Sequence, residues 1–166
     1  MTEENFTINR ETLEVITQGL YRATPDALYQ AYTDKEQIPR WWGPDTIAVE
    51  VDQLDTRVGG SWRFIYSVPG QEPVAWSGIY QELDPPRKLV STFVFEPNPG
   101  HVHIGTVLFE DRHDGTTKVT EILKFMHISD LDEVVASNIA EGQTERQARL
   151  AKLTEQPNQS SEPALA

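Results

Sequence analysis

Between residues 46 and 126 the chain repeats one pattern, in which a short run of apolar and aromatic residues is followed by a turn rich in Gly, Pro and Asp. In the clearest run, Trp62, Phe64 and Tyr66 alternate with residues of a second face. This period of two is typical of a strand whose aromatic face points inward. Six such runs predict six strands, over residues 46–51, 61–68, 74–83, 88–96, 101–110 and 117–126.

The segments on either side of these runs predict one more strand and several helices. β-Branched and apolar residues favour a first strand over residues 13–21. Thr24 and Pro25 suit the cap and first turn of a helix that should end near Thr33, and Asp34 can cap a second short helix over residues 35–38. An acidic, capped start at Ser129 predicts one long helix over residues 129–153.

Seven antiparallel strands with one long C-terminal helix make an α+β fold, in which the helix must cover the apolar face of the sheet. A strongly curved sheet that grips a helix leaves a cavity between the two. We expect one domain over residues 11–154. Residues 1–10 are predicted to be a loose segment, with Phe6 and Ile8 pairing weakly at an edge, and residues 155–166 a disordered tail, because the tail has few apolar residues.

Composition limits the partners and the compartment. The formal net charge of −12 argues against nucleic acid and anionic membranes, which both attract clustered Lys and Arg. The chain has no cysteine, so thiolate chemistry and disulfides are excluded. It has no apolar run near the ~18 residues that span a bilayer, and its acidic first residues do not look like a signal peptide. We therefore expect a cytoplasmic protein that binds neither nucleic acid nor membrane.

Two adjacent tryptophans, Trp41 and Trp42, lie in a short segment bounded by Pro39 and Pro44. The prolines and Gly43 restrict the local backbone path, and two indoles offer a large apolar area. Consecutive residues cannot both point inward at this place. We expect one indole in the core and the other near the entrance of the cavity.

Five segments together resemble a known family. They are TPDALYQAYTD at 24–34, WWGP at 41–44, RVGGSWRF at 57–64, GIYQELDPPRKLV at 78–90 and DGTTKVT at 114–120. In this order they are similar to the activator of heat-shock-protein-90 ATPase homologue-like domain, a member of the START-like, or SRPBCC, superfamily. The resemblance spans Leu13 to Leu153 and implies the helix-grip (START-like, Bet v 1-like) fold. The superfamily includes lipid and hormone binders, polyketide cyclases, oxygenase domains and co-chaperones, so the fold alone does not assign a function.

The chain departs from this family in its last helix. The family usually carries Gly-Trp there, followed four residues after the Trp by Leu, whereas here Gly142 is followed by Gln143, and Gln147 takes the Leu position. Two amides four residues apart share one helix face. Either this face makes the pocket unusually polar for the family, or the two amides lie at the rim and contact water.

Candidate chemistry comes from His103 and Glu121, which the alternation places on the inward faces of neighbouring strands. A carboxylate among apolar residues can act as an acid or base with a histidine partner, or it can anchor a polar group of a ligand. Alternatively, Glu121 reaches water or pairs with Arg63 or Arg146.

Other chemistry finds less support. His101, His103 and Glu121 could in principle hold a divalent ion, but His101 follows a turn at the mouth of its strand. No Gly-x-Ser-x-Gly nucleophile motif occurs. We expect no metal and no cofactor.

These observations lead to one function hypothesis and two alternatives. The domain is expected to bind a small, largely apolar ligand rather than to act as an enzyme. The alternatives are a co-chaperone that stimulates a heat-shock ATPase, as the resemblance implies, and a cyclase or hydrolase that uses His103 and Glu121. A homodimer is plausible. The predicted lining residues are Trp41, Trp42, Trp62, Phe64, Tyr66, Trp76, Tyr80, Phe93, Phe95, His103, Val107, Phe109, Glu121, Gln143 and Gln147.

Overall fold

A computed structural model of the chain describes residues 4–137 and 139–161. Within these ranges the chain forms eight strands and four helical segments. The strands are β1 Glu4–Asn9, β2 Glu14–Tyr21, β3 Ala48–Leu54, β4 Ser61–Ser67, β5 Val74–Asp84, β6 Lys88–Phe95, β7 Val102–Asp111 and β8 Thr117–Lys124. The helical segments are α1 Pro25–Thr33, the 3-10 helix η1 Ile38–Arg40, α2 Ile128–Ala136 and α3 Ile139–Ser161.

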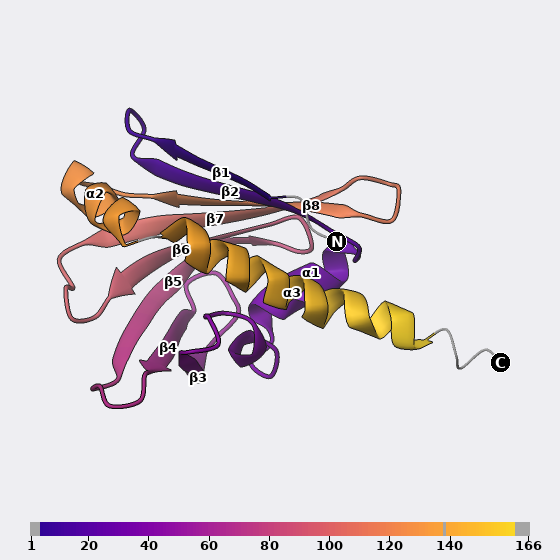
Figure 1. Ribbon diagram of the computed structural model, residues 1–166, viewed down its shortest axis with the longest axis horizontal. Helices are drawn as coiled ribbons and strands as arrows, with labels where there is room; N and C mark the ends of the chain where they lie inside the picture. Colours follow the sequence, from indigo (N-terminus) through magenta and orange to yellow (C-terminus); the bar gives the residue numbers. More distant parts are fainter. Residues whose placement is uncertain (1–3, 138, 162–166) are drawn as a thin grey trace.

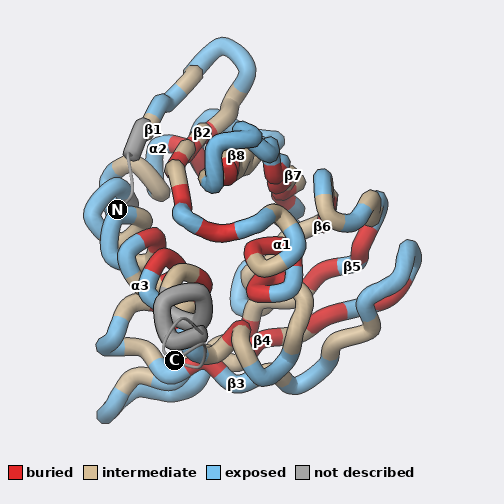
Figure 2. The backbone as a smooth tube through the Cα atoms, turned by 90° about the vertical axis from the view of Figure 1, so that its right-hand side faces the viewer, coloured by how far each residue is buried: buried red, intermediate tan, exposed pale blue. Residues whose placement is uncertain are grey.

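All eight strands form one antiparallel sheet in the order β1-β2-β8-β7-β6-β5-β4-β3. The sheet curves, and α3 runs across its inner side with α1 beneath it (Figure 1). Viewed from the end, the strands follow an arc whose buried residues face α1 and α3 (Figure 2). The predicted α+β helix-grip arrangement is therefore confirmed. No helix in the described ranges is long and apolar enough to cross a membrane.

Helix α1 has the predicted boundaries because its caps are encoded locally. The Thr24 hydroxyl accepts a hydrogen bond from the Ala27 amide at 3.1 Å, and Pro25 occupies the first turn, where its missing N–H costs nothing. The helix ends at Thr33, and the Asp34 amide still donates to the Gln30 carbonyl at 2.8 Å. These caps hold α1 in place between the sheet and α3.

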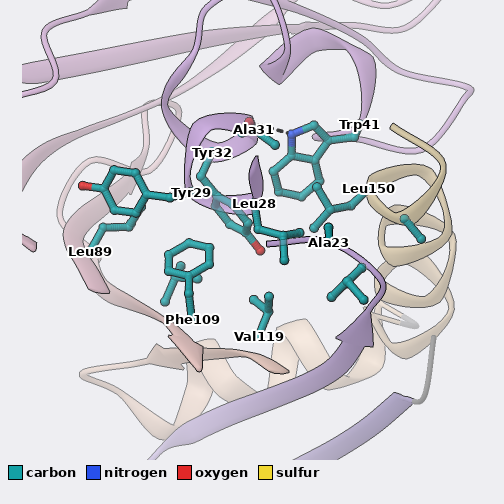
Figure 3. Close-up of a cluster of buried hydrophobic side chains, with 13 residues drawn as sticks. Ala23, Leu28, Tyr29, Ala31, Tyr32, Trp41, Leu89, Phe109, Val119 and Leu150 are labelled. Carbon is teal, nitrogen blue, oxygen red and sulfur yellow. Dashed lines mark hydrogen bonds between the residues drawn. The ribbon is translucent and has the colours of Figure 1, made fainter. Parts of the chain in front are cut away.

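The main core lies where α1, α3 and the sheet meet, and it includes Trp41, which lies near Ala31 and Leu150 (Figure 3). Its indole is 1% exposed, and its Nε1–H donates to the Ala31 carbonyl at 2.8 Å. The ring lies 4.6 Å from that of Tyr32, edge to face, and beside Leu150 of α3. Burying an indole stabilises a fold by about 3 kcal/mol. Through this one side chain, the loop after η1 is packed against both α1 and α3.

The N-terminal segment is more ordered than predicted, although the expected pairing of Phe6 and Ile8 at a sheet edge is confirmed. Residues 4–9 form the edge strand β1, which pairs with β2 from Glu4↔Gly19 to Asn9↔Glu14, so the sheet has eight strands rather than about seven. Two features account for this strand. The Asn9 side chain accepts hydrogen bonds from two amides of the following turn, and Phe6 packs on the core cluster around Leu131.

The C-terminal helix also differs. The predicted single helix is instead two helices, since α2 ends at Ala136 and α3 begins at Ile139. The Ser137 hydroxyl bonds to the Val134 carbonyl, a contact that competes with helix continuation. Helix α3 then extends to Ser161, beyond the predicted end at Leu153 and into the predicted tail. Thr154 is buried, and Glu155 accepts a hydrogen bond from the Arg22 amide, which ties this extension to the domain. Residues 162–166 of the tail lie outside the described residues.

The second short helix forms, but it is a 3-10 turn at Ile38–Arg40 that contains Pro39 instead of ending before it. Asp34 accepts hydrogen bonds from the Glu36 amide and the Gln37 side chain, so residues 35–37 form a turn rather than a helix.

A close approach in the sheet gives a prediction at Gly78. A Cβ at this position would lie 1.9 Å from the Thr92 carbonyl oxygen and 2.7 Å from the Trp62 ring. Because backbone cannot move aside cheaply, Gly78→Ala should lower the free energy of unfolding by about 3 kcal/mol in a urea titration. Gly100→Ala is the matched control, since a Cβ there meets nothing within 4 Å. Equal stability of the two variants would contradict this account.

Candidate functional site

A pocket of about 490 Å³ lies between the inner face of the sheet and the segments that cover it. Its walls come from β2, β4 to β8, the end of α1, the loop after η1, and α3. Most lining side chains are aromatic or aliphatic, and Glu121, Gln143 and Arg146 are the charged or amide-bearing exceptions. Pockets of this volume are large enough to enclose a small molecule.

Ten of the fifteen side chains predicted to line a cavity do line this pocket. They are Trp42, Trp62, Phe64, Tyr66, Trp76, Tyr80, Phe93, Val107, Glu121 and Gln143. Strand alternation accounts for most of them, because it places every second residue of a strand on the inner face.

Three of the other five predicted residues are aromatic side chains that lie in the core or pack behind a residue of the pocket wall. Trp41 and Phe109 pack around Tyr32 in the main core, with ring centroids 4.6 and 5.2 Å from that of the tyrosine. Phe95 lies at the far end of β6, where its ring is 5.1 Å from that of Trp76. Their inward direction was predicted correctly, but none of the three lines the pocket.

The two helix amides have different roles. Gln147 is buried, and its Nε2 donates to the Gln18 carbonyl of β2 at 3.3 Å, so it attaches the helix to the sheet outside the pocket. Gln143 lines the pocket, where its Oε1 accepts from Arg146 at 3.1 Å. The expectation that both amides share one environment is therefore wrong.

One of the adjacent tryptophans lies in the core, as expected, and the other, which was expected near the entrance, lines the pocket. Trp41 is fully buried, whereas Trp42 is partly buried and lines the pocket. The Trp42 Nε1–H donates to the Tyr66 hydroxyl at 2.7 Å. This bond fixes the indole against the strand opposite and leaves its ring to form part of the pocket wall.

Arg146 of α3 is the polar centre of the site. Its guanidinium lies over both indoles, 4.7 Å from the ring centroid of Trp41 and 4.6 Å from that of Trp42. Its Nη1 donates to Glu121 at 2.9 Å, and its Nε donates to the Trp42 carbonyl at 2.8 Å. Cation–π contact and a charge-assisted hydrogen bond together hold the side chain, which is 15% exposed.

Glu121 receives a second hydrogen bond from the Tyr32 hydroxyl. Burial, and then the negative charge of Glu121, raise the pKa of Tyr32 well above its usual value, so this hydroxyl stays protonated. Burial acts to lower the pKa of Arg146, but the charge and hydrogen bond of Glu121, together with Tyr32 and Tyr66, outweigh it, and the net pKa is raised. Glu121 therefore has the ion pair with Arg146 that was one of the alternatives, and it also lines the pocket.

The sequence predicts Arg146 only as a possible partner for Glu121, and it assigns no role in the site to Tyr32. A signal for Arg146 was present, because it follows Gln143 by three residues and so shares its helix face. The other proposed partner, Arg63, instead bonds to Asp52 and Glu96.

His103 and Glu121 do not form a pair. In the β7–β8 register Glu121 lies opposite Val107, four residues along β7 from His103, which corresponds to about 13 Å. His103 packs on Phe125 at 4.7 Å between ring centroids and does not line the pocket. The acid–base pair suggested by the sequence is not assembled.

His101 belongs to a separate cluster at the end of the sheet. Its Nδ1 hydrogen-bonds to Asp130 of α2 at 2.7 Å, and its ring lies 5.3 Å from that of His127. Residues 4–137 and 139–161 contain no group of three or more His, Asp or Glu side chains with geometry for a metal ion. The candidate set of His101, His103 and Glu121 is thus dispersed.

Comparisons with known proteins address the fold. The model of the family described as activator of Hsp90 ATPase homolog 1-like protein matches residues 22–155. A protein from Arthrobacter aurescens has a similar structure, with a TM-score of 0.82 and 20% identity over 92% of this chain and 92% of that one. Protein Ms6760 from Mycobacterium smegmatis has a TM-score of 0.79 and 22% identity over 90% of this chain and 94% of that one. The AHSA1 protein from Silicibacter pomeroyi has a TM-score of 0.67 and 19% identity over 83% of this chain and 94% of that one. No curated protein matches.

The buried ion pair gives a prediction on stability. Glu121→Gln removes the charge that compensates Arg146 and should lower the free energy of unfolding by about 2 kcal/mol, less than for a fully buried pair because both side chains border an open pocket. Glu82→Gln, which breaks the surface pair with Lys88, should cost less than about 0.5 kcal/mol. Urea titration at neutral pH measures both. Equal losses would show that Arg146 does not depend on Glu121.

His103 gives a prediction on pH. Burial lowers its pKa, and although Asp130 raises it, His101 and His127 add to the lowering, so the folded state holds His103 neutral. The unfolded chain takes up a proton near pH 6.5 and the folded chain does so only at lower pH, so stability should fall as the pH drops from about 7.5 to 5.5.

The variant His103→Phe should reduce this pH dependence, by at most about 1.4 kcal/mol per pH unit. His113→Gln, in the exposed hairpin loop, is the control for loss of a histidine from the surface. Chemical denaturation at several pH values measures the dependence, and an unchanged slope for His103→Phe would refute the assignment.

Proposed function

The chain belongs to the family of activator of Hsp90 ATPase homolog 1-like proteins, and on that premise we propose that it binds a small, largely apolar molecule in the pocket between its sheet and α3. The observation that carries the proposal is the pocket itself, about 490 Å³ in volume with walls that are mostly aromatic and aliphatic. Each 100 Å² of apolar ligand surface removed from water there would contribute about 2.5 kcal/mol.

The pocket walls are preorganised, which supports binding of a ready-made guest. Trp62 donates its Nε1–H to the Ser91 hydroxyl at 2.6 Å, and Trp42 donates its own to Tyr66. Both indoles thus have their polar edges satisfied by the protein, and their rings meet Phe64 at 4.7 and 5.1 Å. A guest does not have to order these side chains, so little entropy is lost on binding.

The other functions expected from the sequence stay predictions. A co-chaperone role would appear as stimulation of a heat-shock ATPase by the purified chain. The cyclase or hydrolase hypothesis relied on His103 acting with Glu121, and the separation of these residues removes its geometric basis. The cytoplasmic location and the homodimer also stay predictions.

A pocket-filling variant tests the proposal. Val107 lines the pocket from β7 and is 8% exposed, so Val107→Phe should occupy space needed by a guest. The neutral fluorescent probe N-phenyl-1-naphthylamine should bind the native chain, and its affinity should fall at least about tenfold in Val107→Phe.

Val102→Phe is the matched control, since Val102 lies on the same strand with its side chain exposed. The affinity of this variant for the probe should equal that of the native chain. Thermal unfolding followed by circular dichroism checks that both variants fold. Equal binding by native chain and Val107→Phe, or no binding by the native chain, would contradict the proposal.

A further inference from the structure

Two of the polar contacts in the pocket have a direction that the chemistry of their partners dictates. An indole N–H can only donate, so the Tyr66 oxygen must accept the 2.7 Å bond from Trp42, and its own O–H proton is left over. A guanidinium can only donate, so Gln143 must turn its Oε1 toward Arg146, and its NH₂ group is left over. The orientation of this amide is therefore set by Arg146.

Arg146 keeps unused donors as well. Its Nη1 and Nε make the bonds to Glu121, Gln143 and Trp42, and within residues 4–137 and 139–161 its Nη2 has no hydrogen-bond acceptor. In the same ranges the Tyr66 hydroxyl hydrogen and the Gln143 NH₂ group have none either. Burial raises the pKa of Tyr66 to about 12, so its proton is present at neutral pH. Three side chains that line one pocket thus offer free donors.

Glu121 and Ser91, two acceptors of the same pocket, are already engaged. Both carboxylate oxygens of Glu121 take hydrogen bonds, from Arg146 and Tyr32, and the Ser91 hydroxyl accepts from Trp62 and donates to the Thr92 carbonyl. The polar end of the pocket is therefore rich in donors. Trp42 links two of the donor side chains, because its indole N–H bonds to Tyr66 while its ring packs under the Arg146 guanidinium.

We propose that the pocket selects a neutral molecule whose apolar body carries a hydrogen-bond acceptor, such as a carbonyl oxygen, and that Tyr66, Gln143 and Arg146 hold this acceptor. The inference rests on the proposed function and names the chemical class of its ligand. A guest that lacked the acceptor would cover these donors and leave them without partners, which is costly once the guest has displaced water from the site.

Charge favours the neutral acceptor over an anion. Glu121 already neutralises Arg146 at 2.9 Å. A carboxylate on the guest would bring a second negative charge close to Glu121 in a site of reduced dielectric, and the repulsion would cancel the gain from Arg146. A carbonyl oxygen accepts from the same donors without that repulsion.

Three probes with one ring system test the inference by equilibrium dialysis. They are 2-acetylnaphthalene, which carries a neutral carbonyl; 2-isopropylnaphthalene, its hydrocarbon counterpart; and 2-naphthoate, its anionic counterpart. The ketone should bind at least about tenfold more tightly than the hydrocarbon, which one good hydrogen bond would provide. The naphthoate should bind no more tightly than the hydrocarbon.

Variants assign the effect to the donors. Gln143→Leu and Tyr66→Phe should each lower the ratio of ketone affinity to hydrocarbon affinity about tenfold, because each removes a donor that the ketone satisfies and the hydrocarbon leaves without a partner. Thermal unfolding followed by circular dichroism checks that both variants fold. Of the two, Gln143→Leu is the cleaner change, since Tyr66→Phe also removes the partner of Trp42.

The outcomes separate this inference from the proposed function. Equal affinity for ketone and hydrocarbon, tightest binding of naphthoate, or a ketone preference that survives both substitutions would overturn the inference while binding in the pocket stands. If none of these probes and no N-phenyl-1-naphthylamine binds, the proposed function and the inference fail together.

Discussion

The ion pair between Arg146 and Glu121 is the interaction on which the rest of the site depends. It joins α3 to β8 at 2.9 Å, and the same guanidinium lies over the rings of Trp41 and Trp42. Trp41 in turn belongs to the core between α1 and α3, while Trp42 belongs to the pocket wall. One arginine therefore connects the helix, the sheet and the loop after η1, and sets where the core ends and the pocket begins.

Burying charges normally costs more than a single contact returns, so the pair needs additional partners. Arg146 obtains them from the Trp42 carbonyl and from Gln143, and Glu121 obtains one from Tyr32. Neighbouring residues of α3 add to the attachment, since Arg149 donates to the Gly43 carbonyl and Glu145 accepts from the Asp45 amide at 2.7 Å. The loop that carries Trp42 is thus held to the helix by its own backbone, and this fixes the shape of the pocket.

Much of this fold could be predicted because strand alternation and helix caps are local. Trp62, Phe64 and Tyr66 face inward as their spacing requires, and Thr24 starts α1 as its side chain requires. The pairing of His103 with Glu121 could not be judged in the same way. Alternation determines the face of the sheet that a residue occupies, whereas the distance between two residues depends on the register of the strands, which in a hairpin is fixed by the turn type and the loop length. Arg146 was missed for a related reason, since its role comes from three distant segments that meet around it.

The contacts of Gln143 and Gln147 explain in physical terms how α3 differs from the pattern of its family. The resemblance leads one to expect Trp where this chain has Gln143, and Gln143 lines the pocket beside Arg146. An indole at that position would fill part of the space and would offer Arg146 a ring face instead of an oxygen. At the second departure, Gln147 reaches the Gln18 carbonyl over Gly19, where a Cβ would lie only 3.0 Å from its amide nitrogen. The two substitutions therefore act together: one keeps the pocket open and polar at its inner end, and the other keeps the helix close enough to the sheet to cover it.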